Sequence, residues 1–396
     1  MKFSKIYIGL LFGATLVSCS DDENNTPSIQ APDTYIFTRD GASSVSYSGQ
    51  TTRIAMSHEL GSALKDDSRT KEEMLAMFGH EEGNADFSDA DLNASDKNIK
   101  SKTAASAEFA GSSVDAADIR TQLENWISNQ DDEVFAKWND VASAGSAGQL
   151  VDGTSTRYVS AEGIEYNQVI AKTLIGALLA DQILNNYLSQ TVLDEGTNVD
   201  DNDAEVVVEG KTYTNMEHKW DEAYGYVYGG SEDQPGDLLK YIGSVDGNEN
   251  YTGIADAIED AFILGRAAIV ANEYTVRDGQ AEIIRENISK VIAVRAVHYL
   301  QGGKVALEAA KDAANDNLFG GAFHDLSEGL GFVYSLQFTR KPNTDSPYFS
   351  KEEVEGFIDD ILANENGLWN ASSTTLDEVS EEIVDAFGLV MAEAVQ

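Results

Sequence analysis

The sequence predicts an all-α protein made of two pseudo-symmetric helical bundles, with a short N-terminal hairpin or extended arm. Three observations support this fold class. Apolar residues recur at helical spacing almost everywhere after Thr52, the stretches between them are rich in Gly, Asn and Asp, and one phrase containing histidine and glutamate occurs twice. A repeated phrase is typical of a duplicated structural unit.

The N-terminus, MKFSKIYIGLLFGATLVSCSDDENN, has the order of a secretory signal followed by a lipoprotein cleavage site. Its apolar stretch is too short to span a bilayer comfortably, which favours cleavage. Cys19 is the only cysteine, so its acylation leaves no thiol for a disulfide or a metal site. The expected organisation is a signal peptide at 1–18, lipidation at Cys19, a flexible acidic tether at 19–33, and a helical body at 34–396 with approximate halves 34–250 and 251–396.

Charge restricts the partners that the chain can have. The acidic run after Cys19 resembles the surface-export signal of lipoproteins in Bacteroidota-type Gram-negative bacteria, and this resemblance implies the outer face of the outer membrane. A net charge of −41 repels phosphate backbones, so nucleic acid is excluded as a partner. We expect contact with the membrane through the lipid on Cys19, and an outer-membrane receptor as the candidate protein partner.

The elements follow from the pattern of apolar residues. Residues 33–50 alternate around Asp40-Gly41 and predict a hairpin, the only strand pair expected. Ser350-x-x-Glu353 and Thr375-x-x-Glu378 are capping boxes that predict the start of the last two helices. We predict the other helices over 52–65, 71–79, 114–139, 161–188, 212–228, 252–272, 279–301, 304–314 and 320–338, with loops at 80–112, 141–155 and 189–210 and a break at Gly302-Gly303.

The repeated phrase reads EHKWDEAYGYVY at 217–228 and FHDLSEGLGFVY at 323–334. On a helix, His and Glu four residues apart project from one face, close enough to bond each other or to hold one ion. Gly225 and Gly331, three residues after the glutamates, would let another helix or a ligand approach closely. The copies share His218/His324, Glu222/Glu328, Gly225/Gly331, Tyr226/Phe332, Val227/Val333 and Tyr228/Tyr334.

Neutral imidazole with carboxylate suits iron, zinc or another divalent metal. The alternative is that each His-Glu pair is a buried, mutually satisfied polar pair that fixes helix register and binds no ion. Further oxygen ligands could come from Glu217, Asp325 or Asp181. The metal interpretation predicts a site at the interface of the two bundles formed by His218, Asp221, Glu222, His324 and Glu328.

The sequence contains no catalytic constellation that predicts an enzyme. Ser57-His58-Glu59 resembles the start of a zincin helix, but Ser62 occupies the position of the second histidine. A phosphate-binding glycine loop and a Gly-x-Ser-x-Gly elbow are both missing from the sequence. Trp126, Trp138, Trp220 and Trp369 could stack on a sugar, although their helical spacing favours core positions.

The stretches SSVSYSGQTTRIAMSHELGSAL (43–64), FSDADLNASDKNIKSKTA (87–104) and EHKWDEAYGYVYG (217–229) resemble an uncharacterised lipoprotein family, domain of unknown function 4856. The resemblance covers nearly all of the mature chain and implies no activity.

A more distant likeness is to imelysin-like proteins, all-α envelope proteins with two pseudo-symmetric bundles that are associated with iron uptake. Their hallmark is Gly-x-His-x-x-Glu. His218 and His324 match its histidine, but Asp221 and Ser327 stand at the glutamate, and Met216 and Ala322 at the glycine. This likeness implies a non-enzymatic, metal-binding component of an envelope uptake system. The alternative is a scaffold or adaptor lipoprotein that holds an outer-membrane partner without metal.

Overall fold

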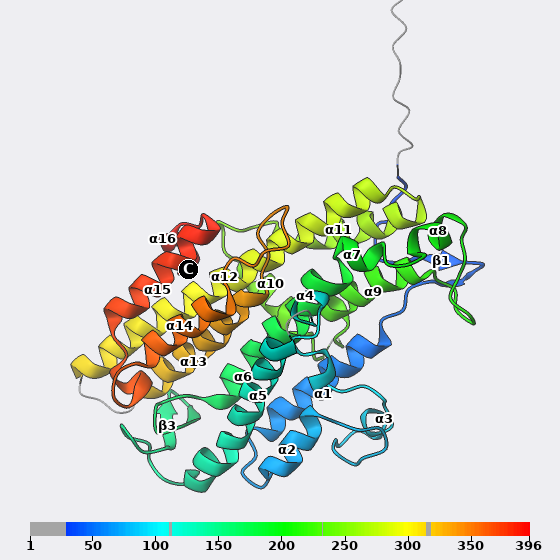
Figure 1. Ribbon diagram of the computed structural model, residues 1–396. Helices are drawn as coiled ribbons and strands as arrows, with labels where there is room; N and C mark the ends of the chain where they lie inside the picture. Colours follow the sequence, from blue (N-terminus) through cyan, green and yellow to red (C-terminus); the bar gives the residue numbers. More distant parts are fainter. Residues whose placement is uncertain (1–28, 111–112, 232, 314–317) are drawn as a thin grey trace, which may run out of the picture.

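The computed structural model describes residues 29–396 except 111–112, 232 and 314–317, and its all-α architecture confirms the predicted fold class (Figure 1). Cys19 and the signal peptide at 1–18 lie outside the described residues. The α-helices are α1 (Ser48–Ala63), α2 (Lys71–Phe78), α3 (Ala90–Asn93), α4 (Ala107–Ala110), α5 (Ser113–Asn129), α6 (Tyr166–Leu174), α7 (Gln190–Leu193), α8 (Asn198–Asp203), α9 (Asn215–Tyr228), α10 (Asp237–Asp246), α11 (Ile254–Val270), α12 (Tyr274–Ala313), α13 (Phe319–Ser335), α14 (Lys351–Leu362), α15 (Ser373–Phe387) and α16 (Met391–Ala394).

Shorter elements connect these helices. The 3₁₀ turns are η1 (Lys100–Lys102), η3 (Phe135–Lys137), η6 (Leu336–Phe338) and η7 (Gly367–Asn370), and the π-helices are η2 (Gln130–Val134) and η4 (Ile175–Tyr187). The strands are β1 (Thr38–Arg39), β2 (Ala42–Ser43), β3 (Gly148–Asp152) and β4 (Ser155–Val159).

Strands β1 and β2 confirm the predicted hairpin, with Asp40 and Gly41 at φ 52° and 79° as its turn requires. The expectation of a single strand pair was wrong, because β3 and β4 form a second antiparallel hairpin across part of the predicted 141–155 loop. Asp152-Gly153 is a hairpin signal in the sequence, and Gly153 has the positive φ of 60° that such a turn needs.

Helix α12 runs through Gly302 and Gly303, so the predicted break at this pair was wrong. Gly303 provides space: a Cβ there would lie 2.6 Å from Leu326 Cγ on α13. The two helices pack closely along their lengths. A glycine inside a helix can therefore serve packing instead of ending the helix.

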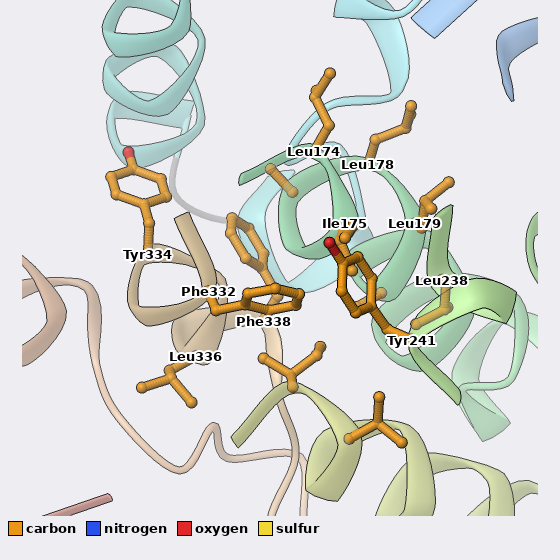
Figure 2. Packing of buried hydrophobic residues seen from close by; sticks show 14 of the residues in the cluster. Leu174, Ile175, Leu178, Leu179, Leu238, Tyr241, Phe332, Tyr334, Leu336 and Phe338 are labelled. Carbon is orange, nitrogen blue, oxygen red and sulfur yellow. The ribbon is translucent and has the colours of Figure 1, made fainter. Parts of the chain in front are cut away.

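The predicted 161–188 helix forms as α6 followed directly by the 13-residue π-helix η4. Figure 2 shows Leu174, Ile175, Leu178 and Leu179 on this segment, with Ile175 beside Tyr241, in the core where α10 and α13 meet it. π-helices of this length are rare, and all but one residue of η4 is buried.

Capping decides where the last two long helices begin. Ser350 and Glu353 form the predicted capping box of α14. The box predicted at Thr375 was wrong, because α15 begins at Ser373, where the Ser372 side chain accepts a hydrogen bond from the Thr375 N–H. Helix N-termini are commonly capped by serine, and here the nearer serine takes the position.

The long helix α12 organises the molecule (Figure 1), with α11, α13 and α15 packed along it. Helix α6, from the first predicted half of the chain, packs on α13 from the second. Helix α9 lies against η4, α1 and α11. The β1–β2 hairpin lies beside α8 and α9, whereas the β3–β4 hairpin contacts α13 at the other end.

Candidate functional site

Helix α9 carries the first copy of the repeated phrase, and a capping box sets its start. The Thr214 hydroxyl accepts from the Glu217 N–H, and the Glu217 carboxylate accepts from the Thr214 N–H at 2.7 Å. Because the helix begins at Asn215, Glu217 and Asp221 lie one turn apart on the same face. Both carboxylates bind one side chain of α11.

That side chain is Arg266, which is fully buried and forms what we call the arginine cluster with Arg39, Glu217 and Asp221. Its Nε lies 3.0 Å from Asp221 Oδ1 and its Nη1 lies 2.9 Å from Glu217 Oε1. Arg39 binds both oxygens of Glu217, at 2.7 and 3.0 Å. Two guanidinium groups thus match two carboxylates, a balance that buried charges require.

The arginine cluster fastens the N-terminal arm (residues 35–47) to α9 and α11. The Tyr35 hydroxyl donates to Asp221 Oδ1 at 2.7 Å, and the Ser46 N–H donates to Asp221 Oδ2 at 3.1 Å. Arg266 also donates to the Ser44 carbonyl oxygen at 3.3 Å and lies over the ring of Phe37, 4.9 Å from its centroid. The arm is therefore attached by side chains that are largely buried, with Asp221 and Arg266 at 0% exposure.

The two carboxylates of the cluster have opposite pKa shifts. Burial raises the pKa of Asp221 to about 6, although Arg266 and the Tyr35 hydroxyl act in the other direction. Burial also acts to raise the pKa of Glu217, but the hydrogen bond from Arg39 and the charge of Arg266 outweigh it, and the pKa is lowered. Glu217 is consequently the firmly ionised member of the pair.

His218 and Glu222, the predicted pair of the first copy, lie apart from the arginine cluster and no ion pair between them is present among the described residues. The His218 ring stacks on Tyr213 at 4.5 Å between centroids, and burial lowers its pKa. Glu222 accepts from Gln50 at 3.0 Å and lies 3.7 Å from Lys219. His218 and Glu222 therefore contact different neighbours and do not form the predicted pair.

Helix α13 carries the second copy, in which the predicted His-Glu pair does form. His324 Nε2 lies 3.6 Å from Glu328 Oε1, and its Nδ1 lies 2.8 Å from Glu165 Oε2. Lys172 lies 3.3 Å from Glu328, and the Tyr241 hydroxyl donates to Glu328 at 3.5 Å. Burial acts to raise the pKa of Glu328, but Lys172, the Tyr299 hydroxyl and His324 together outweigh it, and the pKa is lowered. We call these five residues the histidine cluster.

The five side chains of the predicted metal site are not brought together. The partners of His218, Asp221 and Glu222 all lie outside the second copy, and those of His324 and Glu328 lie outside the first. Within the described part of the chain, no group of three or more His, Cys, Asp or Glu side chains is placed to hold a metal ion. Cationic side chains occupy the positions that an ion would need: Arg266 contacts Asp221 and Lys172 contacts Glu328.

Asp181, considered as a further ligand, is buried on η4 and accepts hydrogen bonds from Ser106 and Asn185.

The glycines of the two copies play the same part. A Cβ at Gly225 would lie 2.4 Å from Tyr47 Cβ at the start of α1, and one at Gly331 would lie 2.5 Å from Lys172 Cβ on α6. The predicted close approach of another helix is thus confirmed at both positions. The same two helices supply the partners of the glutamates, Gln50 on α1 and Lys172 on α6.

Two more contacts are shared by the copies. The residue two places after each histidine packs against a glycine of a neighbouring helix: Trp220 against Gly265 of α11, and Leu326 against Gly303 of α12. The residue three places after each histidine accepts a backbone N–H at the start of a helix. Asp221 accepts from Ser46 just before α1, and Ser327 from Glu165, the N-cap of α6, at 2.9 Å.

Residues 32–390 match one protein-family model, described as Domain of unknown function (DUF4856). The chain belongs to this family. The matched range contains both copies of the phrase and both clusters. No curated protein and no solved structure matches the DUF4856 chain.

The cations of both clusters were missed by the sequence analysis, although each leaves a signal. Arg266 stands in AFILGRAAIV and Lys172 in QVIAKTLIGALLA, so each is a single charge within an apolar helix. A charge in such a place is buried and needs a partner of opposite sign. That rule predicts two buried ion pairs, but it does not name the carboxylates.

In the part of the DUF4856 chain that the structure describes, no helix is both long enough and apolar enough to cross a bilayer.

Proposed function

We propose that this DUF4856 protein is a non-enzymatic scaffold or adaptor lipoprotein, held by a lipid on Cys19 at the outer face of the outer membrane, where its helical body holds a protein partner. The lipoprotein cleavage site and the acidic tether support the location. The scaffold role is supported by one observation above all, the arginine cluster. Its charges are balanced within the chain, so its carboxylates serve attachment of the arm and not ligand binding.

The arginine cluster holds the segment of the chain that directly follows the tether. The chain passes from the tether at 19–33 into the arm at 35–47, which Asp221 and Arg266 hold against α9 and α11. A body attached in this way keeps a fixed orientation relative to the arm. An adaptor that presents one surface to a partner benefits from such a fixed attachment.

The shared contacts of the two copies support the predicted duplication. We infer that α1 with α9 and α11 corresponds to α6 with α13 and α12, because the glycine, glutamate and backbone contacts recur in both sets. In this interpretation the phrase encodes a junction of three helices. The imelysin-like relationship, with its two pseudo-symmetric bundles, remains a proposal that this correspondence favours.

The metal-binding uptake function predicted from the sequence is the competing hypothesis, and one experiment separates the two. We expect full-length protein purified without added metal to contain no stoichiometric iron or zinc by elemental analysis. The double variant His218→Ala/His324→Ala should melt about 1–2 °C lower, as expected for a loss of about 1 kcal/mol in a chain of this length, equally with and without chelator. His58→Ala, outside both clusters, is the matched control. One equivalent of metal in the wild type that is lost in the double variant would establish the metal function instead.

Location and partner are tested on cells. Cys19→Ala should move the protein from the membrane fraction to the soluble fraction, and external protease should digest the wild type on intact cells. Chemical cross-linking on intact cells should give one discrete adduct with wild-type protein, reduced in an Arg266→Met variant whose arm is released. Only uncross-linked monomer in both samples would contradict the adaptor role.

A further inference from the structure

A cleft of about 380 Å³ lies where α5, α13 and α14 meet the start of α6. Its floor is apolar and includes Leu330 and Val169, while its rim carries carboxylates and amides. Volumes of this order, with an apolar floor and few polar groups, are typical of small-ligand sites. The residues of the cleft have no part in the arginine or histidine clusters.

Aromatic side chains form one wall of the cleft. The rings of Trp126 on α5 and Tyr334 on α13 meet edge to face, with centroids 5.5 Å apart. Trp126 is only half-buried, so part of its indole faces the cleft. Of the four tryptophans considered for ligand stacking, Trp126 is the one that lines this cleft. Such a face attracts cations through the ring quadrupole.

Tyr334 is the observation that indicates a ligand. The residue is 4% exposed, yet within the described residues its hydroxyl has no hydrogen-bond partner. Figure 2 shows the ring turned away from Phe332 and Phe338 with its oxygen pointing outward from the core, and the contact with Trp126 places it toward α5. The hydroxyl oxygen is not completely enclosed, so it can form a hydrogen bond with a molecule that enters the cleft.

The charges around the cleft are of one sign. Glu162, Glu355 and Asp359 line it, and none of the described residues that line it is Lys, Arg or His. Glu355 is paired with Lys351 at 2.8 Å. Glu162 and Asp359 are exposed and take part in no ion pair in the described part of the chain. Two free carboxylates beside an open indole favour a positively charged ligand and repel an anion.

We propose that this cleft binds an organic cation, a primary ammonium or guanidinium group carried on an apolar stem. The stem lies on the apolar floor and the charge lies between Asp359 and the face of Trp126, where cation–π attraction and the carboxylate act together. The Tyr334 hydroxyl accepts a hydrogen bond from the cationic N–H. A neutral sugar would use the ring and the amides but would gain nothing from the free carboxylates.

The test uses the full-length protein labelled with 5-fluorotryptophan and observed by ¹⁹F NMR, with the Trp126 resonance assigned from a Trp126→Phe variant. Titration with n-pentylammonium is expected to shift this resonance saturably, whereas 1-pentanol, which lacks the charge, should bind at least about tenfold more weakly. n-Butylguanidinium replaces the ammonium group in a second titration. Cadaverine and Nα-acetyl-lysine methylamide distinguish a free amine from a peptide side chain. The Trp138 resonance is an internal control, because that ring stacks on Tyr158 elsewhere.

Matched variants test which carboxylate of the cleft binds the cationic group of the ligand. Asp359→Asn should weaken n-pentylammonium binding about threefold, while Asp360→Asn, one residue along α14 and outside the cleft, should leave it unchanged. Tyr334→Phe should also weaken binding without lowering the melting temperature, since its hydroxyl bonds to no described residue. Equal affinity for 1-pentanol, equal effects of the two Asp→Asn changes, or tighter binding of a neutral methyl glycoside would each overturn the proposal.

Discussion

In α9 the buried carboxylates are matched by arginines that arrive from β1 and α11, whereas in α13 Glu328 is matched by Lys172 of α6 and by the histidine of its own helix. Both helices nevertheless use the glycine of the phrase to seat a neighbouring helix. The contacts that set the distance between helices are the same, and the contacts that neutralise charge differ.

One position accounts for much of this difference. Three residues after the histidine the first copy has Asp221 and the second has Ser327, which carries no charge. In both copies the glycine of the neighbouring helix is followed by a cation, Arg266 after Gly265 and Lys304 after Gly303. Arg266 turns inward to Asp221, while Lys304 pairs with Asp377 of α15. Where the phrase supplies no carboxylate at this position, the cation pairs with a carboxylate of another helix.

The largest expected effect comes from removing the buried cation of each copy. Arg266→Met leaves Glu217 and Asp221 buried with half of their positive charge gone, and should lower the free energy of unfolding by about 3–5 kcal/mol. Lys172→Met should cost less, because Glu328 keeps His324 and the Tyr241 hydroxyl. Urea unfolding of both variants measures the difference.

Exposed cations give the control for these variants. Lys97→Met, which removes a partner of exposed Asp96, should change stability by no more than about 1 kcal/mol. If Lys172→Met proved as damaging as Arg266→Met, the two clusters would be equivalent in energy and the comparison would fail.

The next effect tests the contact that the copies share. A Cβ at Gly331 would meet Lys172 Cβ at 2.5 Å and the Val169 carbonyl oxygen at 2.8 Å, whereas one at Gly225 would meet Tyr47 Cβ at 2.4 Å and the Tyr47 ring. Gly331→Ala and Gly225→Ala should each cost about 1–3 kcal/mol through overpacking, with Gly331→Ala the worse because two neighbours of its Cβ are held by the backbone, while the ring of Tyr47 can turn. Gly356→Ala on α14 has open space and should be neutral or stabilising, by up to about 1 kcal/mol. Thermal unfolding of the three variants in parallel would show a stabilised Gly331→Ala if the helices were loosely packed.

Much of the fold could be predicted because its determinants are local. The helical spacing of apolar residues, the Asp40-Gly41 turn and the Ser350 capping box act within a few residues, and the structure confirms each. The β3–β4 hairpin was missed although Asp152-Gly153 was equally local. The continuity of α12 was missed for another reason, since the role of Gly303 depends on Leu326 of a different helix.

The site was harder to predict because its partners are distant in sequence. Asp221 takes its hydrogen bonds from Tyr35, Ser46 and Arg266, which are far from it along the chain. The sequence analysis gave His218, Asp221 and Glu222 the same role as metal ligands, with Glu217 as a further candidate, yet it is Asp221 and Glu217 that carry the buried charge of the first copy, paired with Arg266. Residue type and spacing on one helix show what a face could bind, but not which side chain of another element reaches it first.

The smallest expected effect concerns the histidine of the first copy and its response to acid. Burial lowers the pKa of His218 below its ordinary value of 6.5, so as pH falls through 6.5 the unfolded chain takes up a proton before the native protein does, and stability is lost. His218→Phe keeps a ring against Tyr213 but cannot titrate, and should lose less stability between pH 7.5 and pH 5.5 than the wild type, by urea unfolding at both values. Tyr213→Phe retains the imidazole and should keep the wild-type pH dependence. An equal loss of stability in His218→Phe would mean that the acid response arises from other groups. The different neighbours of His218 and His324 would then have no consequence for stability in this pH range.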